Sequence, residues 1–411
     1  MPPTIKRIAE RILAQIRRHG LLNLVRRFYQ RFLATKPSIT VERFVYSDES
    51  SSLGDHEYDL ALKLIERLKT VIRLRDSADP QRLADQTALP ASNWDRARGQ
   101  HFELDGKDTN SFTTSDLVLS GDYAVLRKLR LYSQAFTGYQ LATLEFNYLR
   151  PWIRDRLPDN LDEFLRLIVS MPDDMSVQIP AVMSKLPEKL RISPPLKFGE
   201  MGWMVNGRII NYDVYSYLYE LCLMYENGVL QCLEKGGAER CVRVLEIGGG
   251  YGSLAYYLMK IYGNLRYVIV DIPESLLFSS IYLTTLFPDL THELVENDSR
   301  QSESPDDAGF TFVPNLLMEQ ISPTSGKFDL VINTLSLTEM NASQIVYYCK
   351  KVRELIKPEG MFFEHNVDNF GSEVEDIESL IKKNFSPNFV RCKTAIMNDP
   401  SFRGRARIWT L

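Results

Sequence analysis

A short glycine-rich run limits the folds open to this chain more than any other feature of its sequence. The apolar run Val242–Ile247 ends at Gly248-Gly249-Gly250-Tyr251-Gly252, and a helix-prone stretch, 254–261, follows. Glycine tolerates positive φ and lets a ligand approach the backbone closely. The first N–H groups of a helix have no partner inside the helix and can face that ligand. The pattern therefore predicts a strand, a tight turn and a helix, with a nucleotide-like ligand at the turn.

The glycine spacing separates two classes of nucleotide cofactor. Dinucleotide-binding turns place glycine at the first, third and sixth positions, whereas the sixth position here is Ser253. An acid, Glu246, also lies two residues before the first glycine. The run resembles the first motif of class I S-adenosylmethionine (SAM) methyltransferases, in which this acid lies near the amino-acid end of the cofactor. The resemblance implies SAM as the cofactor, bound at Glu246, Gly248, Gly250, Tyr251 and Gly252.

A second acid supports this interpretation. Asp271 ends the apolar run 267–271 and lies about 20 residues beyond Gly252, where a ribose-binding carboxylate belongs. Ile272 follows it and is expected at the same cofactor. The alternative is an ordinary strand-turn-helix unit whose strand-end acids lie at the surface. A dehydrogenase is disfavoured by Ser253 and Glu246.

Strands and helices alternate from residue 241 to the end of the chain, which is typical of a parallel sheet with crossover helices. We expect strands at 242–247, 267–271, 310–313, 328–335 and 360–367, helices at 274–286 and 343–356, and a closing hairpin from 389–395 and 406–411. The acidic stretch 289–307 is predicted to be a loop insertion. The predicted fold class is α/β: a Rossmann-like, seven-stranded class I methyltransferase domain preceded by a mostly helical N-terminal region.

Four segments are expected along the chain. They are a basic amphipathic helical segment (1–36), a mostly helical N-terminal domain (37–198), a connecting segment with a lid helix (199–240), and the SAM-binding methyltransferase domain (241–411). The helix predicted at 212–233 is rich in tyrosine, which suits packing across the catalytic domain or a lid over the substrate. Near its start, Asn211 or Asp213 is expected to reach the cofactor.

Residues 1–36 differ from the rest of the chain in charge. They carry nine Lys or Arg and one Glu, whereas the whole chain has a net charge of −4. Their apolar residues recur at helical spacing. Such a segment can contact an anionic membrane surface peripherally, pack on the acidic remainder of the chain, or pack on a partner subunit. Nucleic acid is not an expected partner, because the basic character ends at Lys36 and no aromatic-basic platform follows.

The sequence also predicts where the protein resides. No apolar run approaches the length of a membrane span, and the amino terminus lacks a signal-peptide core. We therefore expect a cytoplasmic protein, with the inner face of the membrane as a second place if residues 1–36 contact lipid. The sequence does not indicate an oligomeric state.

Polar residues follow two later strands. Asn333-Thr334-Leu335-Ser336-Leu337-Thr338-Glu339-Met340 follows the fourth, and Glu364-His365-Asn366 ends the fifth. In open α/β sheets, ligands bind beyond the carboxyl ends of the strands. Together with Glu-Ile-Gly-Gly-Gly-Tyr-Gly and Val-Asp-Ile-Pro-Glu, the fourth-strand run resembles a family of sugar O-methyltransferases from bacterial antibiotic and surface-glycan pathways. The resemblance covers roughly the carboxyl-terminal half and the Gly-Glu and Asn-Tyr-Asp stretch just before it. It implies methyl transfer from SAM to a hydroxyl of a sugar or glycan.

Methylation of a sugar hydroxyl needs a general base that takes the proton as the new bond forms. Glu339 is the first candidate, and His365 is the second. Their structural alternatives are an acid favoured by the dipole of the following helix and a satisfied core histidine. Asn333 is expected to orient the cofactor or to fix the strand end.

Other functions stay open at this point. A compact cluster of Asp and His ligands is not apparent, so we expect no required metal. The acceptor can also be a non-sugar oxygen, a nitrogen or a carbon. A binding or scaffold protein that keeps the SAM fold without turnover is the alternative from another class.

Overall fold

The computed structural model describes residues 41–47, 52–77, 114–133, 173–234, 241–297, 307–322, 327–367, 376–393 and 404–411. The basic segment predicted at 1–36 lies outside the described residues, so its helices and its membrane contact stay predictions. Among the helices of the described ranges, none has both the length and the apolar character needed to cross a membrane.

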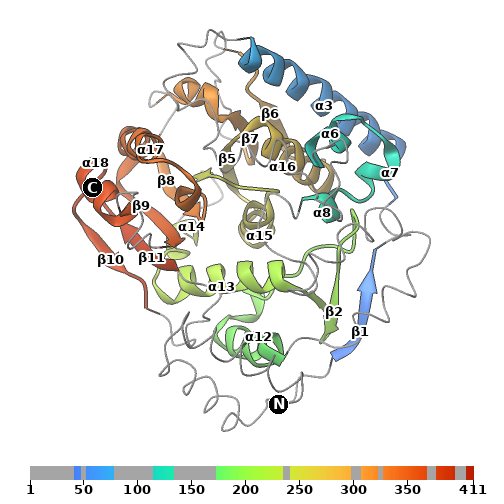
Figure 1. The fold of residues 1–411 in the computed structure, drawn as a ribbon. Coiled ribbons are helices and arrows are strands. Elements are labelled where there is room, and N and C mark those ends of the chain that lie inside the picture. Colours follow the sequence, from blue (N-terminus) through green and yellow to red (C-terminus); the bar gives the residue numbers. More distant parts are fainter. Residues whose placement is uncertain are drawn as a thin grey trace, which may run out of the picture.

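The carboxyl-terminal half is built on an eight-stranded sheet with the order β10-β11-β9-β8-β4-β5-β7-β6 (Figure 1). Its strands are β4 (Val242–Ile247), β5 (Leu265–Asp271), β6 (Thr291–Leu294), β7 (Gly309–Pro314), β8 (Phe328–Thr334), β9 (Ile356–Val367), β10 (Phe389–Arg391) and β11 (Gly404–Trp409). Strands β4 to β9 pair in parallel. Strand β11 pairs antiparallel with both β9 and β10, which is the predicted closing hairpin. The predicted α/β class is confirmed.

The strand count exceeds the predicted seven by one. The additional strand is β6, which pairs with the edge of β7 through Thr291 and Gly309. It lies within 289–307, so the prediction of a loop insertion is wrong for residues 291–294. Its sequence, Thr-His-Glu-Leu, is short and polar, as edge strands often are, and it offers little apolar pattern to recognise.

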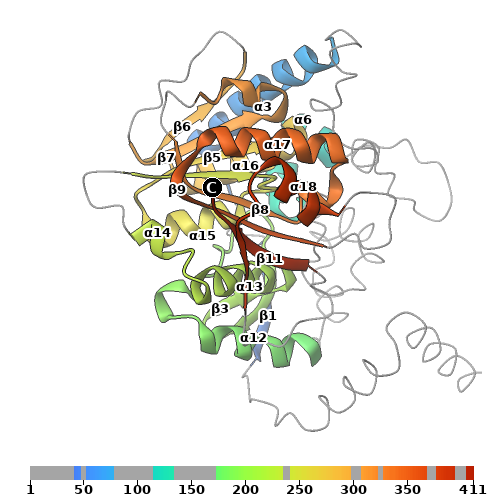
Figure 2. The ribbon, with the colours of Figure 1, turned by 90° about the vertical axis from the view of Figure 1, so that its left-hand side faces the viewer.

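Helices cover both faces of the sheet. One face carries α13 (Tyr212–Glu226), α15 (Ser253–Tyr262) and α16 (Pro273–Leu286), and the other carries α17 (Ala342–Leu355) and α18 (Ile377–Asn384), which lie in front of the sheet in Figure 2. A hydrophobic core lies on each side of the sheet, between the sheet and the helices that cover it. Alternate residues of a strand point into the two cores: Val244 belongs to the core under α13, α15 and α16, and Leu245 to the core under α17 and α18. The helices predicted at 274–286 and 343–356 are α16 and α17.

The N-terminal region packs against this layer rather than standing apart. Its described helices are α3 (Asp55–Asp76), α6 (Thr114–Leu119), α7 (Tyr123–Leu126), α8 (Leu129–Tyr132) and α12 (Asp173–Lys185). Helix α3 lies along α16 (Figure 1), and Arg75 holds Glu274 through two hydrogen bonds of 2.9 and 2.8 Å. Helix α16 is buried from Pro273 to Thr285, because the N-terminal helices cover the side that the sheet leaves open.

A second, three-stranded antiparallel sheet was not predicted. It joins β1 (Val41–Tyr46) to the hairpin of β2 (Met201–Val205) and β3 (Arg208–Ile210). The hairpin turns at Asn206 and Gly207, whose φ angles are 50° and 72°. An Asn-Gly pair is a strong signal for a two-residue hairpin turn, so this element had a signature in the sequence.

The tyrosine-rich helix is shorter than the predicted 212–233. Helix α13 ends at Glu226, near Gly228 with its φ of 77°, and a short α14 (Gln231–Glu234) follows. Three 3₁₀ turns complete the described elements, at Glu188–Leu190, Asn315–Gln320 and Leu337–Glu339.

Candidate active site

The glycine turn between β4 and α15 occupies the point where the strand order reverses. Strand β4 has β5 on one side and β8 on the other, and a crevice beyond such a point is where open α/β sheets bind ligands. Gly248, Gly250 and Gly252 have φ angles of 78°, 57° and 87°, which other residues rarely adopt. A Cβ on Gly248 would lie 2.1 Å from Ser336 Oγ, so glycine is required there on steric grounds as well.

Asp271 links the end of β5 to the glycine turn. Its Oδ2 accepts hydrogen bonds from the Gly250 N–H at 2.9 Å and the Ser275 hydroxyl at 2.8 Å, and its Oδ1 accepts one from the Ile272 N–H at 2.8 Å. A carboxylate can accept about four hydrogen bonds, so these three leave acceptor capacity for a ribose hydroxyl. Burial raises the pKa of Asp271 to about 6, although the three donors lower it.

Glu246 lies beneath the same turn. Its side chain is 2% exposed, and its Oε2 accepts a hydrogen bond from the Tyr267 hydroxyl at 2.9 Å. A Cβ on Gly249 would lie 3.2 Å from that oxygen. Burial raises the pKa of Glu246 to about 7. A cationic group of a ligand at the turn would favour the ionised carboxylate.

Asn333 holds the end of β8 to the end of β4. Its Nδ2 donates to the Ile247 carbonyl at 2.8 Å and lies 2.5 Å from Ser336 Oγ. Its Oδ1 accepts from Asn366 Nδ2 at 3.0 Å and from the Leu337 N–H at 3.3 Å. These contacts fix the strand end, and a direct contact of Asn333 with the cofactor stays a prediction.

The turn that follows β8 brings Glu339 toward the same edge of the sheet. Leu335 has a φ of 62°, which is costly for a branched side chain, and its N–H donates to the His365 carbonyl at 2.8 Å. Ser336 then contacts Gly248, as described above. Glu339 ends the 3₁₀ turn and is half-buried, with its N–H bonded to the Ser336 carbonyl at 3.1 Å. The turn is therefore adjacent to the glycine turn, and the role of Glu339 as a base stays a prediction.

His365 lies at the carboxyl end of β9, under α13. Its side chain is 2% exposed, and its Nδ1 lies 2.6 Å from Oε1 of Glu220. The Tyr219 ring is 6.1 Å away, centroid to centroid. Glu220, an acid in an apolar helix, was not predicted as a site residue. It is 3% exposed because α13 packs on the sheet.

Asp213 forms part of a buried ion cluster behind the glycine turn. It pairs with Arg130 of α8, which also donates to Glu200 at 2.9 Å. The Arg130 guanidinium lies 3.8 Å from the centroid of the Tyr251 ring. Asp213 is thus connected to the glycine turn indirectly: it pairs with Arg130, and Arg130 lies over the Tyr251 ring. A direct contact of Asp213 with a cofactor stays a prediction. Arg130 was not predicted as a site residue, because it does not belong to a recognisable motif.

Within the described ranges of the chain, no three or more His, Cys, Asp or Glu side chains are grouped so that they could hold a metal ion.

No protein-family model matches the sequence, and no curated protein matches it either. Solved structures are similar to about half of the chain. One is a candidate O-methyltransferase from Nostoc punctiforme, 11% identical with a TM-score of 0.29, over 48% of this chain and 60% of that one. Another is magnesium protoporphyrin IX methyltransferase from Synechocystis PCC 6803 with bound SAM, 14% identical with a TM-score of 0.30, over 47% and 81%.

A third is the N-methyltransferase NodS from Bradyrhizobium japonicum WM9 with bound S-adenosylhomocysteine, 14% identical with a TM-score of 0.30, over 47% and 85%. The match thus spans about 60% of the length of the Nostoc protein. The substrates and cofactors named for those proteins belong to them.

Proposed function

We propose that this protein is a SAM-dependent O-methyltransferase that methylates a hydroxyl of a sugar, in a glycan or a glycosylated metabolite. The observation that carries the proposal is the placement of Glu246 and Asp271 around the glycine turn, at the point where the strand order reverses. Asp271 is hydrogen-bonded to the turn itself, through the Gly250 N–H at 2.9 Å.

The chemistry of the two acids fits the two ends of SAM. SAM has a ribose with two hydroxyl donors, an ammonium group and a sulfonium. Asp271 retains acceptor capacity for the ribose, and buried Glu246 would be stabilised in its ionised form by a nearby cation. Ser253 stands where a dinucleotide-binding turn has its third glycine, which favours SAM over a dinucleotide.

Bound SAM would supply a methyl group attached to a sulfonium sulfur. When the methyl group is transferred, the sulfur would leave as a neutral thioether. The protein then has two tasks: to align the acceptor oxygen with the methyl carbon, and to remove the proton of the hydroxyl. We propose Glu339 as the group that takes this proton, because it is half-buried on the turn that contacts Gly248. His365, oriented by Glu220, is the second candidate.

The choice of a sugar acceptor rests on the resemblance of the run 333–340 alone. A non-sugar oxygen, a nitrogen or a carbon is the nearest alternative acceptor. A neutral amine can attack without a base, so a requirement for Glu339 would favour oxygen.

Calorimetric titration with SAM tests the proposal at its first step. We expect the wild-type protein to bind SAM and Gly250→Val to lose that binding, because valine would fill the space above the turn at a φ of 57°. A circular dichroism spectrum equal to that of the wild type would show that the variant is folded. If the wild type does not bind SAM, the scaffold alternative holds instead.

Mass spectrometry tests the acceptor. Glycans and glycosylated metabolites from cells with and without the protein should differ by the mass of one methyl group. If that shift appears only in molecules without a sugar, the sugar part of the proposal is wrong and the methyltransferase part stands.

A further inference from the structure

We infer that Arg130 is a positioning residue for the glycine turn, so that binding of the methyl donor depends on an ion cluster supplied by the N-terminal region. This inference rests on the proposed function, because the donor is the ligand expected at the turn.

The cluster is formed by three charged residues that are distant in sequence. Arg130 is in α8, Glu200 precedes β2, and Asp213 is in the first turn of α13. The Arg130 Nε donates to Glu200 at 2.9 Å, its Nη1 donates to Ser133 Oγ at 2.8 Å, and its Nη2 donates to Asp213. The side chains of the three charged residues are at most 1% exposed. Their geometry is therefore set by one another and not by solvent.

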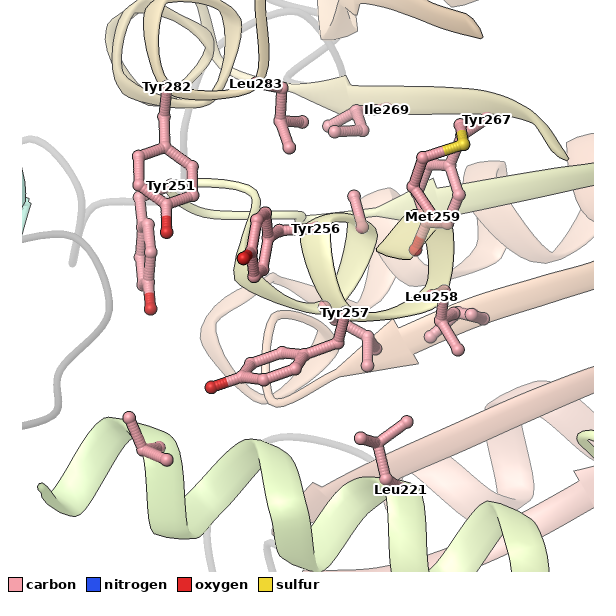
Figure 3. Close-up of a cluster of buried hydrophobic side chains, with 14 of the residues drawn as sticks. Leu221, Tyr251, Tyr256, Tyr257, Leu258, Met259, Tyr267, Ile269, Tyr282 and Leu283 are labelled. Atoms are coloured by element: carbon pink, nitrogen blue, oxygen red, sulfur yellow. The ribbon is translucent and has the colours of Figure 1, made fainter. Parts of the chain in front are cut away.

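Tyr251 connects this cluster to the glycine turn. Four of the five residues from Gly248 to Gly252 are glycines, so Tyr251 supplies the one side chain that the surrounding protein can hold. The Arg130 guanidinium lies over its ring, 3.8 Å from the centroid. The Tyr282 ring of α16 packs at its edge, with 5.4 Å between centroids, and Figure 3 shows these two rings one above the other.

Glycine backbones have wide conformational freedom, so contacts outside the turn must select its bound shape. The ring of Tyr251 is fully enclosed, at 2% exposed, and a cation over an aromatic face is attractive when both are desolvated. Arg130 thus favours one arrangement of the ring and, through it, one arrangement of the backbone on either side. Those backbone groups include the Gly250 N–H that bonds Asp271.

A second ion pair offers a matched control. Arg75 of α3 pairs with Glu274 of α16 at 2.9 and 2.8 Å, and Arg75 is 2% exposed. This pair also joins the N-terminal region to the catalytic half. The hydrogen bonds of the Arg75 side chain go to Asp76 and Glu274, and neither of these residues belongs to the glycine turn. A change at Arg75 therefore reports on the general cost of disturbing a buried ion pair.

The experiment compares Arg130→Lys with Arg75→Lys in the full chain. Lysine keeps the charge but loses the planar fork and the stacking on the ring. We expect Arg130→Lys to weaken SAM binding about tenfold, the effect of one lost buried cation–π or hydrogen-bonding contact. Arg75→Lys should leave SAM affinity within about twofold, because it perturbs packing and not the turn. Melting temperatures of both variants establish that the comparison is between folded proteins.

A double-mutant cycle shows whether Arg130 acts through Tyr251. Tyr251→Leu removes the ring and leaves the three charged residues of the ion cluster in place. If the inference is right, Arg130→Lys adds no further loss of SAM affinity to Tyr251→Leu.

Three results would overturn the inference. They are wild-type SAM affinity in Arg130→Lys, an equal loss in Arg75→Lys, or losses at Arg130 and Tyr251 that multiply. If Arg130→Lys does not fold, Tyr251→Leu must still weaken SAM binding about tenfold. An unchanged SAM affinity in Tyr251→Leu rejects the inference. Failure of the wild type to bind SAM would instead reject the proposed function, and this inference with it.

Discussion

At the scale of single residues, the glycines differ in the space that is available for a Cβ atom. Gly248 faces Ser336, with 2.1 Å between a Cβ and the hydroxyl oxygen, whereas a Cβ on Gly263 would meet nothing within 4 Å. Both glycines have positive φ, at 78° and 71°. A residue with a Cβ would therefore be strained by the backbone conformation at both positions, but only at position 248 would the Cβ also meet a neighbouring side chain.

Gly248→Ala should accordingly weaken SAM binding by more than about tenfold, because Ser336 must move away from the turn. Gly263→Ala should keep SAM affinity and lose about 1 kcal/mol of stability through left-handed strain. Calorimetric titration and urea unfolding measure the two effects. Equal SAM affinity in both variants would contradict the expected role of Gly248.

Glu246 should make stability depend on pH. Its pKa is about 7 in the folded protein, against an ordinary value of 4.5, because it is buried. The folded state therefore holds the proton more tightly, and this contribution to stability is complete below pH 4.5 and is lost as the pH rises to 7. The shift is equivalent to about 3 kcal/mol.

Glu246→Gln cannot ionise, so its free energy of unfolding should exceed that of the wild type by up to about 3 kcal/mol at pH 8, with a smaller difference at pH 5. Urea unfolding at the two pH values measures this. The same variant should bind SAM more weakly, because it lacks the negative charge. A pH-independent difference would show that Glu246 is not protonated in the fold.

Glu339→Gln tests the proposed base. We expect turnover to fall by a factor of about 10² to 10⁴ while SAM affinity is retained, because the amide cannot take a proton. His365→Asn is the companion variant for the second candidate. If turnover is unchanged in Glu339→Gln and lost in His365→Asn, the base is His365.

Residues with a local signature could be predicted from the sequence, and residues defined by packing could not. Glu246, Asp271 and the glycines follow from spacing within one strand-turn-helix unit and the next strand. Arg130 and Glu220 act on partners distant in the chain: Arg130 lies over Tyr251, and Glu220 bonds His365. Their contacts form only when α8 and α13 pack on the large sheet and its helices.

At the scale of elements, the strands with continuous apolar runs were predicted well. Strand β4 matches its predicted bounds, 242–247, and β8 differs by one residue at its end. The missed strands, β1 and β6, are edge strands with polar residues, and each depends on a partner strand for its conformation. Hairpin β2–β3 had its Asn-Gly signal, but its short strands lack a long alternating pattern.

The unpredicted sheet gives a prediction of its own. Gly202 in β2 pairs with Val45 of β1, and a Cβ there would lie 2.5 Å from the Ile210 carbonyl oxygen of β3. Gly202→Ala should therefore destabilise the protein by about 1–3 kcal/mol by separating the strands. Urea unfolding measures the loss, and wild-type stability would contradict the described pairing.

At the scale of the whole molecule, one hydrophobic core joins the N-terminal region to the sheet. The cluster that contains Leu64 of α3 also contains Leu277 of α16 and Ile332 of β8. Native-state hydrogen exchange should therefore show the slowest amides of α3 and α16 opening with the same free energy. Faster exchange throughout α3 would show that the N-terminal helices unfold independently of the carboxyl-terminal half.

The covering of α16 by α3 has a practical consequence for anyone who wishes to isolate the carboxyl-terminal half. Residues 241–411 include every strand of the large sheet, so the sequence alone suggests that they could be expressed as a separate domain. Expressed alone, that fragment would expose an apolar helix surface to water and leave the Glu274 carboxylate without its arginine. We expect it to aggregate, so a shortened form of this protein should be trimmed from its extreme amino end and not cut before the sheet.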